Sequence, residues 1–286
     1  MLGLEELEVG LIFWASDNLR DDVRAAKAYG LRAGQLGIQA GLEIESAAEI
    51  WDRVLTDEHF IVTALVCSFD GESYTDIPTV ARTVGLVPPS SRAERVARLK
   101  AISALGRHLG IDCVACHIGV IPPGHDARSY SEVLDVTREI CGFCQANGQS
   151  FALETGQEPA KVLLRFIEEV DRANLKINFD PANMILYGTG DPLDALDVLA
   201  KRVISVHCKD AEWPDRAHPD ALGQEAPLGH GKVDIPAFIA KLKSNGYTGP
   251  LIIEREQGEA RQRSAEMREA INLLRKAVSA GRAAAS

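Results

Sequence analysis

Short apolar runs alternate with longer amphipathic stretches along the whole chain. The short runs are rich in Val, Ile and Leu and have the length of β-strands, whereas the stretches between them repeat apolar residues at helical spacing. The eight predicted strands are residues 7–14, 32–38, 60–68, 112–118, 150–155, 175–180, 203–208 and 250–255. The eight predicted helices are residues 18–29, 43–57, 91–109, 129–147, 159–172, 192–202, 235–245 and 259–278.

Local signals support this division of the chain. Asp191 precedes Pro192 at one predicted helix start, and Gly30 and Gly110 follow predicted helix ends. Eight strands alternating with eight helices predict one (β/α)8 TIM barrel over residues 1–286. The alternative is a doubly wound open sheet, but no Gly-rich phosphate-binding turn follows the first strand.

Three predicted connections are long and contain several Pro and Gly residues. They are residues 69–90, 119–128 and 209–233, and each follows a strand. In a barrel, the connections after strands lie on the face that holds the active site. We therefore expect these three loops to cover a substrate site.

Composition narrows the possible partners and the location. The 286 residues carry a formal net charge of −10, which repels phosphate backbones, so we expect no nucleic-acid partner. The sequence has no apolar run of about 18 residues, so we expect no membrane span. The first residues lack the basic and apolar segments of a secretory signal, which favours a cytoplasmic location. The six cysteines are predicted to be buried, reduced thiols.

Four potential metal ligands lie at the ends of four successive predicted strands. They are Glu154, Asp180, His207 and Glu254. The carboxyl ends of barrel strands meet at one rim, and the alternation of side chains along each strand allows all four to point into the mouth. Three carboxylates and one imidazole suit a hard divalent cation.

Five segments around these positions resemble the xylose isomerase-like superfamily of TIM barrels, in the branch of sugar phosphate isomerases and epimerases. The resemblance is strongest from about residue 95 to residue 256. The segments are Leu-Glu-Thr-Gly (153–156), Asn-Phe-Asp-Pro-Ala-Asn (178–183), Val-His-Cys-Lys-Asp (206–210), Pro-Leu-Gly-His-Gly-Lys-Val-Asp (227–234) and Ile-Ile-Glu-Arg-Glu (252–256).

This resemblance implies a cofactor and a mechanism. One divalent ion (Mn²⁺, Mg²⁺, Co²⁺ or Zn²⁺, with Mn²⁺ favoured) is expected on Glu154, Asp180, His207 and Glu254. In the ketose epimerases of this group, the two glutamates are also the acid/base pair. One removes a proton beside the carbonyl and the other returns one, while the metal stabilises the enediolate. The two catalytic carboxylates would then be Glu154 and Glu254.

The chain departs from the family pattern at one position. Asn183 stands where many of these epimerases have a histidine, and an amide cannot shuttle protons. We expect His117, on the fourth strand, to supply the missing imidazole as a catalytic residue. Asn183, Lys209, Glu256 and Trp14 are the predicted substrate contacts, with Trp14 stacking on a sugar ring. No phosphate loop is evident, and Arg255 and Lys232 are the candidate anion contacts.

The predicted function is a divalent-metal-dependent sugar isomerase or epimerase that acts on a small carbohydrate. The alternative is a metal-dependent lyase or dehydratase on keto-sugars, keto-glycosides or inososes, because proton abstraction beside a carbonyl also begins β-elimination. A non-catalytic sugar-binding subunit is a third possibility. An abasic-site endonuclease is disfavoured, because only His117 and His207 lie at inward strand ends and the net charge is acidic. A homodimer or homotetramer is expected by analogy.

Overall fold

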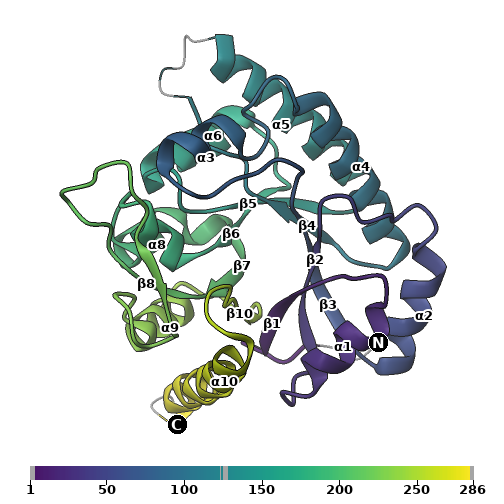
Figure 1. The fold of residues 1–286 in the computed structure, drawn as a ribbon, viewed down its shortest axis with the longest axis vertical. Coiled ribbons are helices and arrows are strands. Elements are labelled where there is room, and N and C mark those ends of the chain that lie inside the picture. Colours follow the sequence, from purple (N-terminus) through teal and green to yellow (C-terminus); the bar gives the residue numbers. More distant parts are fainter. Residues whose placement is uncertain (1–3, 123, 125–127, 284–286) are drawn as a thin grey trace.

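Eight parallel strands close into a barrel surrounded by helices (Figure 1). The structure is a computed structural model that describes residues 4–122, 124 and 128–283. Around the barrel the strands follow the order β1-β10-β7-β6-β5-β4-β3-β2. The predicted TIM barrel is thereby confirmed. Each predicted strand overlaps a barrel strand. These are β1 (Val9–Trp14), β2 (Ala33–Ile38), β3 (Ile61–Cys67), β4 (Cys113–Cys116), β5 (Ser150–Glu154), β6 (Leu175–Phe179), β7 (Val203–Cys208) and β10 (Leu251–Ile253).

The predicted helices also occur, with ends shifted by a few residues. They are α1 (Leu19–Lys27), α2 (Ala48–Glu58), α4 (Arg92–His108), α5 (Arg128–Ala146), α6 (Ala160–Val170), α8 (Pro192–Leu199), α9 (Ile235–Ser244) and α10 (Ala260–Ala283). The helix predicted over residues 192–202 ends at Leu199 and continues as a 3₁₀ turn, Ala200–Arg202. No helix among the described residues is long and apolar enough to cross a membrane.

Two of the long connections contain regular structure that the sequence analysis did not predict. The connection over residues 69–90 contains helix α3 (Ile77–Thr83). The connection over residues 209–233 contains an antiparallel hairpin of β8 (Asp210–Glu212) and β9 (Gln224–Ala226). A further short helix, α7 (Pro181–Leu186), follows β6 directly. The third predicted loop, residues 119–128, lies partly outside the described residues.

The core has two parts, divided by the wall of strands. The outward strand faces pack against the helices in one large apolar cluster. The lower barrel interior holds mainly small residues, including Ala64, Ala115 and Ala152. Cys113 belongs to this interior cluster and Cys116 to the outer one, so the two thiols point to opposite faces. All six cysteines are buried and free, as predicted. Small residues therefore fill the lower interior of the barrel, and polar side chains lie above them at the rim.

Candidate active site

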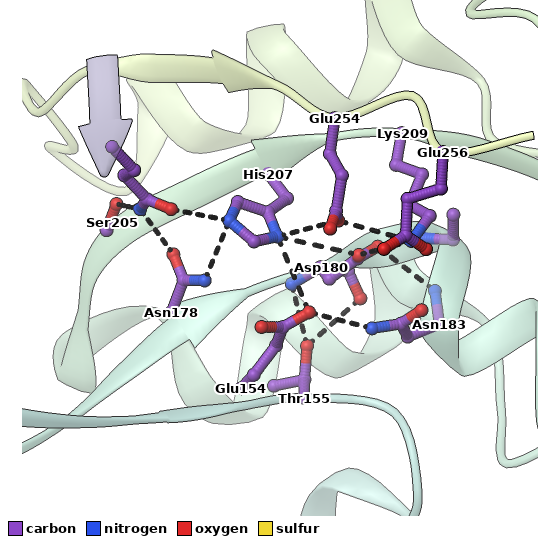
Figure 2. A network of polar contacts seen from close by, with 12 residues as sticks. Glu154, Thr155, Asn178, Asp180, Asn183, Ser205, His207, Lys209, Glu254 and Glu256 are labelled. Atoms are coloured by element: carbon purple, nitrogen blue, oxygen red, sulfur yellow. Dashed lines mark hydrogen bonds and ion pairs between the residues drawn. The ribbon is translucent and has the colours of Figure 1, made fainter. Parts of the chain in front are cut away.

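The barrel rim brings all four predicted ligand residues together (Figure 2). Glu154 ends β5, Asp180 follows β6, His207 lies on β7 and Glu254 follows β10. One potential ligand atom from each residue lies within 4.8 Å of the other three, and all four side chains are buried. Residues up to 100 positions apart in the sequence thus meet because parallel strands end at one rim.

Asp180 is oriented by the start of helix α7. Its Oδ1 accepts hydrogen bonds from the backbone N–H groups of Ala182 (2.7 Å) and Asn183 (3.0 Å), as a helix N-cap does. Thr155 fixes the backbone of Asp180 through hydrogen bonds to its N–H (2.8 Å) and its carbonyl (3.0 Å). The second oxygen, Oδ2, is buried and has no hydrogen bond among the described residues. One carboxylate oxygen therefore serves the fold, and the other faces the cluster.

His207 is oriented by a side chain from the opposite side of the barrel. Its Nε2 lies 2.7 Å from Oε1 of Gln35 on β2. The Asn178 Nδ2 group, a donor, also lies 3.0 Å from this nitrogen. We assign the hydrogen to Nε2 on the shorter contact, because the Gln35 oxygen can only accept, and this leaves the lone pair of neutral His207 on Nδ1. Gln35 is itself held, because its Nε2 donates to Ser205 Oγ (2.7 Å) and to Asn178 Oδ1 (3.2 Å). This fully buried network fixes the imidazole from below.

The lone pair of His207 Nδ1 faces three carboxylates. Nδ1 lies 2.9 Å from Glu254 Oε2, 3.4 Å from Glu154 Oε1 and 3.7 Å from Asp180 Oδ2. It forms no hydrogen bond with a described residue. Buried acceptor atoms this close repel one another unless positive charge, from protons or a metal ion, lies between them, because water does not screen the repulsion. A donor set of three carboxylates and one imidazole fits Mn²⁺, Mg²⁺, Co²⁺ or Zn²⁺.

The raised pKa values of His207 and Asp180 show that this cluster attracts protons. Burial lowers the pKa of His207, but the carboxylates of Glu254 and Glu154 outweigh it and raise that pKa well above its usual value. Burial also raises the pKa of Asp180 to about 6. Protons therefore occupy the cluster when no metal is bound, and a metal ion would displace them.

Lys209 lies beside the cluster. Its Nζ donates to Glu254 Oε2 and to Glu256 Oε2, both at 3.2 Å, and lies 4.0 Å from Asp180 Oδ2. Burial raises the pKa of Glu254, but Lys209 and His207 outweigh it and lower that pKa to about 2. Lys209 thus forms ion pairs with Glu256 and with Glu254, both of which line the same cavity.

Two side chains flank Glu154 on the cavity side. Asn183 Nδ2 donates to Glu154 Oε1 (2.9 Å), and His117 Nε2 lies 3.3 Å from the same oxygen. Gln157 Nε2 lies 2.8 Å from His117 Nδ1 and fixes the other side of the ring. Burial lowers the pKa of His117, but Glu154 outweighs it and raises that pKa to about 9. Asn183 therefore orients Glu154, while His117 can donate a proton beside it.

A cavity of about 840 Å³ opens above the cluster. Its lining includes seven of the nine predicted site residues: Trp14, His117, Glu154, Asn183, Lys209, Glu254 and Glu256. The other two, Asp180 and His207, are fully buried beneath it. The Trp14 indole lies over Gly37 on β2, where a Cβ atom would lie 2.5 Å from the ring. Gly37 thus leaves room for Trp14 to reach the cavity wall.

Several residues that complete the site were not predicted from the sequence. Gln35 and Thr155 orient His207 and Asp180, and Gln157 orients His117. One of them left a readable signal: Gln35 is a polar residue inside an otherwise apolar strand run. Tyr74, which also lines the cavity, lies in a connection that was predicted only as a loop.

The candidate anion contacts are engaged elsewhere. Arg255 pairs with Glu225 (3.0 Å) and Glu266 (2.8 Å), and Lys232 pairs with Glu212 (3.3 Å). Arg255 and Lys232 are both absent from the cavity lining. The structure therefore does not support the expectation that they bind a substrate anion.

The fold and the rim define a TIM barrel with a buried carboxylate and imidazole cluster. The family profile described as xylose isomerase-like TIM barrel matches residues 23–277. The chain therefore belongs to this family, as the resemblance implied. A solved xylose isomerase domain protein from Planctomyces limnophilus is 39% identical, covers 95% of this chain and 97% of its own, and superposes with a TM-score of 0.89.

Two curated proteins match over shorter segments. A rhizopine catabolism protein (MocC) of Rhizobium meliloti is 35% identical over 106 residues, which are 32% of each chain. An inosose dehydratase of Lacticaseibacillus casei is 26% identical over 117 residues, which are 37% of this chain and 39% of the relative. The chain thus matches about a third of the length of these curated relatives.

More distant solved structures share the fold. A xylose isomerase-like TIM barrel protein from Mycobacterium smegmatis, solved in complex with magnesium, is 19% identical with a TM-score of 0.68 and covers 91% of this chain and 89% of its own. An L-ribulose 3-epimerase is 17% identical with a TM-score of 0.70 and covers 97% of both chains. At this identity the likeness concerns the fold alone.

Proposed function

We propose that this protein is a divalent-metal-dependent isomerase or epimerase that moves a proton beside the carbonyl of a small, polyhydroxylated ketone. The observation that carries the proposal is the meeting of Glu154 and Glu254 on one cluster below a cavity of sugar size. β5 and β10 are separated by two strands in the barrel, so the two carboxylates approach the cluster from different directions. Two bases on different sides of one carbon are what inversion requires.

The residues of the chain have distinct roles in this proposal. Glu154, Asp180, His207 and Glu254 would hold the cation, which supplies Lewis-acid polarisation of the substrate carbonyl when it is bound. Glu154 accepts the proton through a carboxylate oxygen, while the Asn183 amide keeps that carboxylate in place. Glu254 takes a proton from solvent and returns it to the substrate from the other side, while Glu154 releases its proton to solvent. Lys209 Nζ holds Oε2 of Glu254. The connections over residues 69–90 and 209–233 contribute to the lining of the cavity.

A dehydratase is the second candidate, and one observation favours it. β-Elimination needs an acid that protonates the departing hydroxyl group as well as a base that removes the proton. His117 Nε2 lies 3.3 Å from Glu154 Oε1 and lines the cavity, so an acid is available beside the base. The segment shared with inosose dehydratase is in keeping with this second candidate.

Deuterium uptake from heavy water tests the proposal. The Mn²⁺-loaded protein is incubated with a panel of ketoses and keto-cyclitols, and the products are read by NMR and mass spectrometry. We expect deuterium at a carbon beside the carbonyl, and a loss of at least about 100-fold in Glu154→Gln and in Glu254→Gln. Glu139→Gln is the control, because Glu139 lies on α5 and is paired with Lys100.

The products separate the two candidates. A recovered ketose with inverted or shifted configuration supports the isomerase or epimerase, whereas an unsaturated or dehydrated product supports the dehydratase. Exchange that persists in Glu154→Gln contradicts both. The small-carbohydrate partner, the cytoplasmic location and the homodimer or homotetramer stay predictions.

A further inference from the structure

Tyr74 is an exposed aromatic residue at the mouth of the cavity. It follows β3, lines the cavity and keeps 43% of its surface accessible. Its ring centroid lies 5.6 Å from that of His117, with the ring planes inclined at 56°. A large aromatic surface beside the candidate acid is thus left for a ligand to cover.

The loop that carries Tyr74 is braced on both sides. Glu72 accepts backbone hydrogen bonds from Phe69 (3.0 Å) and Gly85 (2.8 Å). The buried guanidinium of Arg95 donates to the carbonyls of Asp70, Thr83 and Gly85 at 2.6–2.9 Å. Farther along, the Ile77 N–H donates to the Asp220 carbonyl (3.0 Å), which joins this loop to the β8–β9 connection. Tyr74 is therefore held in place while exposed, which favours a preformed contact.

The charges of the cavity favour an uncharged ligand. The described lining residues include four carboxylates, those of Glu72, Glu154, Glu254 and Glu256. Within the described lining, the cationic side chains are Lys209 and His117, and both already contact these carboxylates. Apart from the proposed metal ion, which the substrate carbonyl would engage, a phosphate or carboxylate on the substrate would meet no unpaired cationic side chain in the described lining and would be repelled by these carboxylates.

We propose that Tyr74 determines substrate specificity by packing its ring against the flat C–H face of an uncharged cyclic polyol ketone. This inference rests on the proposed function and adds the substrate class. A closed ring presents a rigid apolar face with its hydroxyl groups at the edge. An open-chain ketose presents no such face and must lose conformational freedom on binding. Trp14 and Tyr187 extend the aromatic lining of the same cavity.

The test compares ring and open-chain probes on matched variants. Binding of myo-inositol, D-glucitol and myo-inositol 1-phosphate to the Mn²⁺-loaded protein is measured by calorimetry, since none of them has a carbonyl that could react. The variants are Tyr74→Ala, Tyr74→Phe and Trp213→Ala. Trp213 is the control, because it is also 43% exposed on a loop after a strand but does not line the cavity. Deuterium exchange with 2-keto-myo-inositol and D-fructose gives kcat and KM separately.

We expect the wild-type protein to bind myo-inositol at least about 10-fold more tightly than D-glucitol or the phosphate. Tyr74→Ala should remove that preference and raise KM for 2-keto-myo-inositol about 10-fold with little change in kcat, a loss of about 1.4 kcal/mol. Tyr74→Phe and Trp213→Ala should stay within about 2-fold of wild type.

Three results would overturn the inference: no myo-inositol binding, a preference for D-glucitol or the phosphate, or unchanged binding in Tyr74→Ala. Failure of the proposed function looks different, because the binding preference would remain while no substrate exchanged deuterium.

Discussion

At the scale of the residue, Asp180 and His207 each use one polar atom to bond to the surrounding fold and turn another toward the cluster. Asp180 uses Oδ1 to cap α7 and leaves Oδ2 free, and His207 uses Nε2 on Gln35 and leaves Nδ1 free. Each side chain is therefore fixed by one atom and available through another. Preorganisation of this kind lowers the cost of binding a cation, because the ligands need not be ordered at that moment.

Gln35 should tune cation affinity without touching the cation. Gln35→Leu removes the acceptor at His207 Nε2, and we expect Mn²⁺ affinity to fall about 10- to 100-fold. Ser205→Ala is the matched control, because it removes a partner of the Gln35 amide but leaves the contact with His207. Its loss should be smaller. Equal affinities in wild type and Gln35→Leu, measured by calorimetry, would show that this contact does not orient the imidazole.

Glu158 should make stability depend on pH. Burial raises the pKa of this carboxyl to about 7 from an ordinary value of 4.5, although the Ile121 N–H donates to it. The folded state therefore binds more protons than the unfolded state between pH 4.5 and 7. The stability that Glu158 contributes is fully present below pH 4.5 and is lost as the pH rises through 7.

Glu158→Gln tests this in urea unfolding of the metal-free protein. Relative to wild type, the variant should gain about 2 kcal/mol on going from pH 5 to pH 8, because it has no carboxylate to ionise. Glu132→Gln is the control. Arg92 and Arg128 hold the pKa of Glu132 below its ordinary value, so its contribution should not change over this range. A difference between wild type and Glu158→Gln that does not change with pH would refute the assignment.

The sequence sufficed to select the four candidate ligand residues that the fold brings together, but not the residues that orient them. Glu154 and Glu254 could be predicted because a polar residue at a strand end stands out from an apolar run. Gln157 could not, because its partner His117 is 40 residues away and follows another strand. Contacts of this kind depend on how strands are placed around the barrel, which periodicity does not encode.

At the scale of the element, helix α7 connects the fold to the site. It begins at the Asp180-Pro181 pair, which is the same start signal that correctly predicted α8 at Asp191-Pro192. No helix was predicted at Asp180, and α7 contains only six residues. Short helices lack the two turns of periodicity that reveal longer ones. The hairpin of β8 and β9, with three-residue strands, was missed for the same reason.

The close approach of α7 to the turn after β5 requires a glycine. Gly156 has φ of +145°, and a Cβ atom there would clash with the Cβ of Asn183. We expect Gly156→Ala to cost about 1–3 kcal/mol of stability and to displace the Asn183 amide from Glu154. Gly142→Ala, within α5, is the control, because nothing lies within 4 Å of its added Cβ. That variant should be neutral or stabilising by up to about 1 kcal/mol.

Chemical denaturation and deuterium exchange together test this prediction. Gly156→Ala should lose both stability and activity, whereas Gly142→Ala should keep its activity. If Gly156→Ala were as stable and as active as wild type, the packing of α7 would not be needed to position Asn183.

At the scale of the whole molecule, barrel closure explains why distant residues form one site. A parallel barrel could be predicted, because strands that alternate with helices favour this arrangement. It places the ends of β5, β6, β7 and β10 side by side along one part of the rim (Figure 1). The arrangement of the loops above the rim was not predictable, since it depends on contacts such as that between Ile77 and Asp220.

Closure also links the site to stability. Four buried ligand residues from separate strands contact one another only in the folded chain. A cation that binds there stabilises the folded state by mass action, by about 2.7 kcal/mol at 100 times its Kd. We therefore expect the melting temperature to rise by several degrees when Mn²⁺ is added to metal-free protein, and EDTA to reverse the shift. Melting curves that do not respond to either addition would contradict this expectation.

Titration of Mn²⁺ into metal-free wild-type protein and into Asp180→Asn is the most direct test of the cation site. Asparagine keeps an oxygen for the α7 cap but replaces the free Oδ2 with an amide nitrogen, so the fold is preserved while a ligand is lost. We predict one saturable site per chain in wild type and a loss of at least about 100-fold in affinity in Asp180→Asn. No saturable site in wild type, or the same affinity in both proteins, would contradict it.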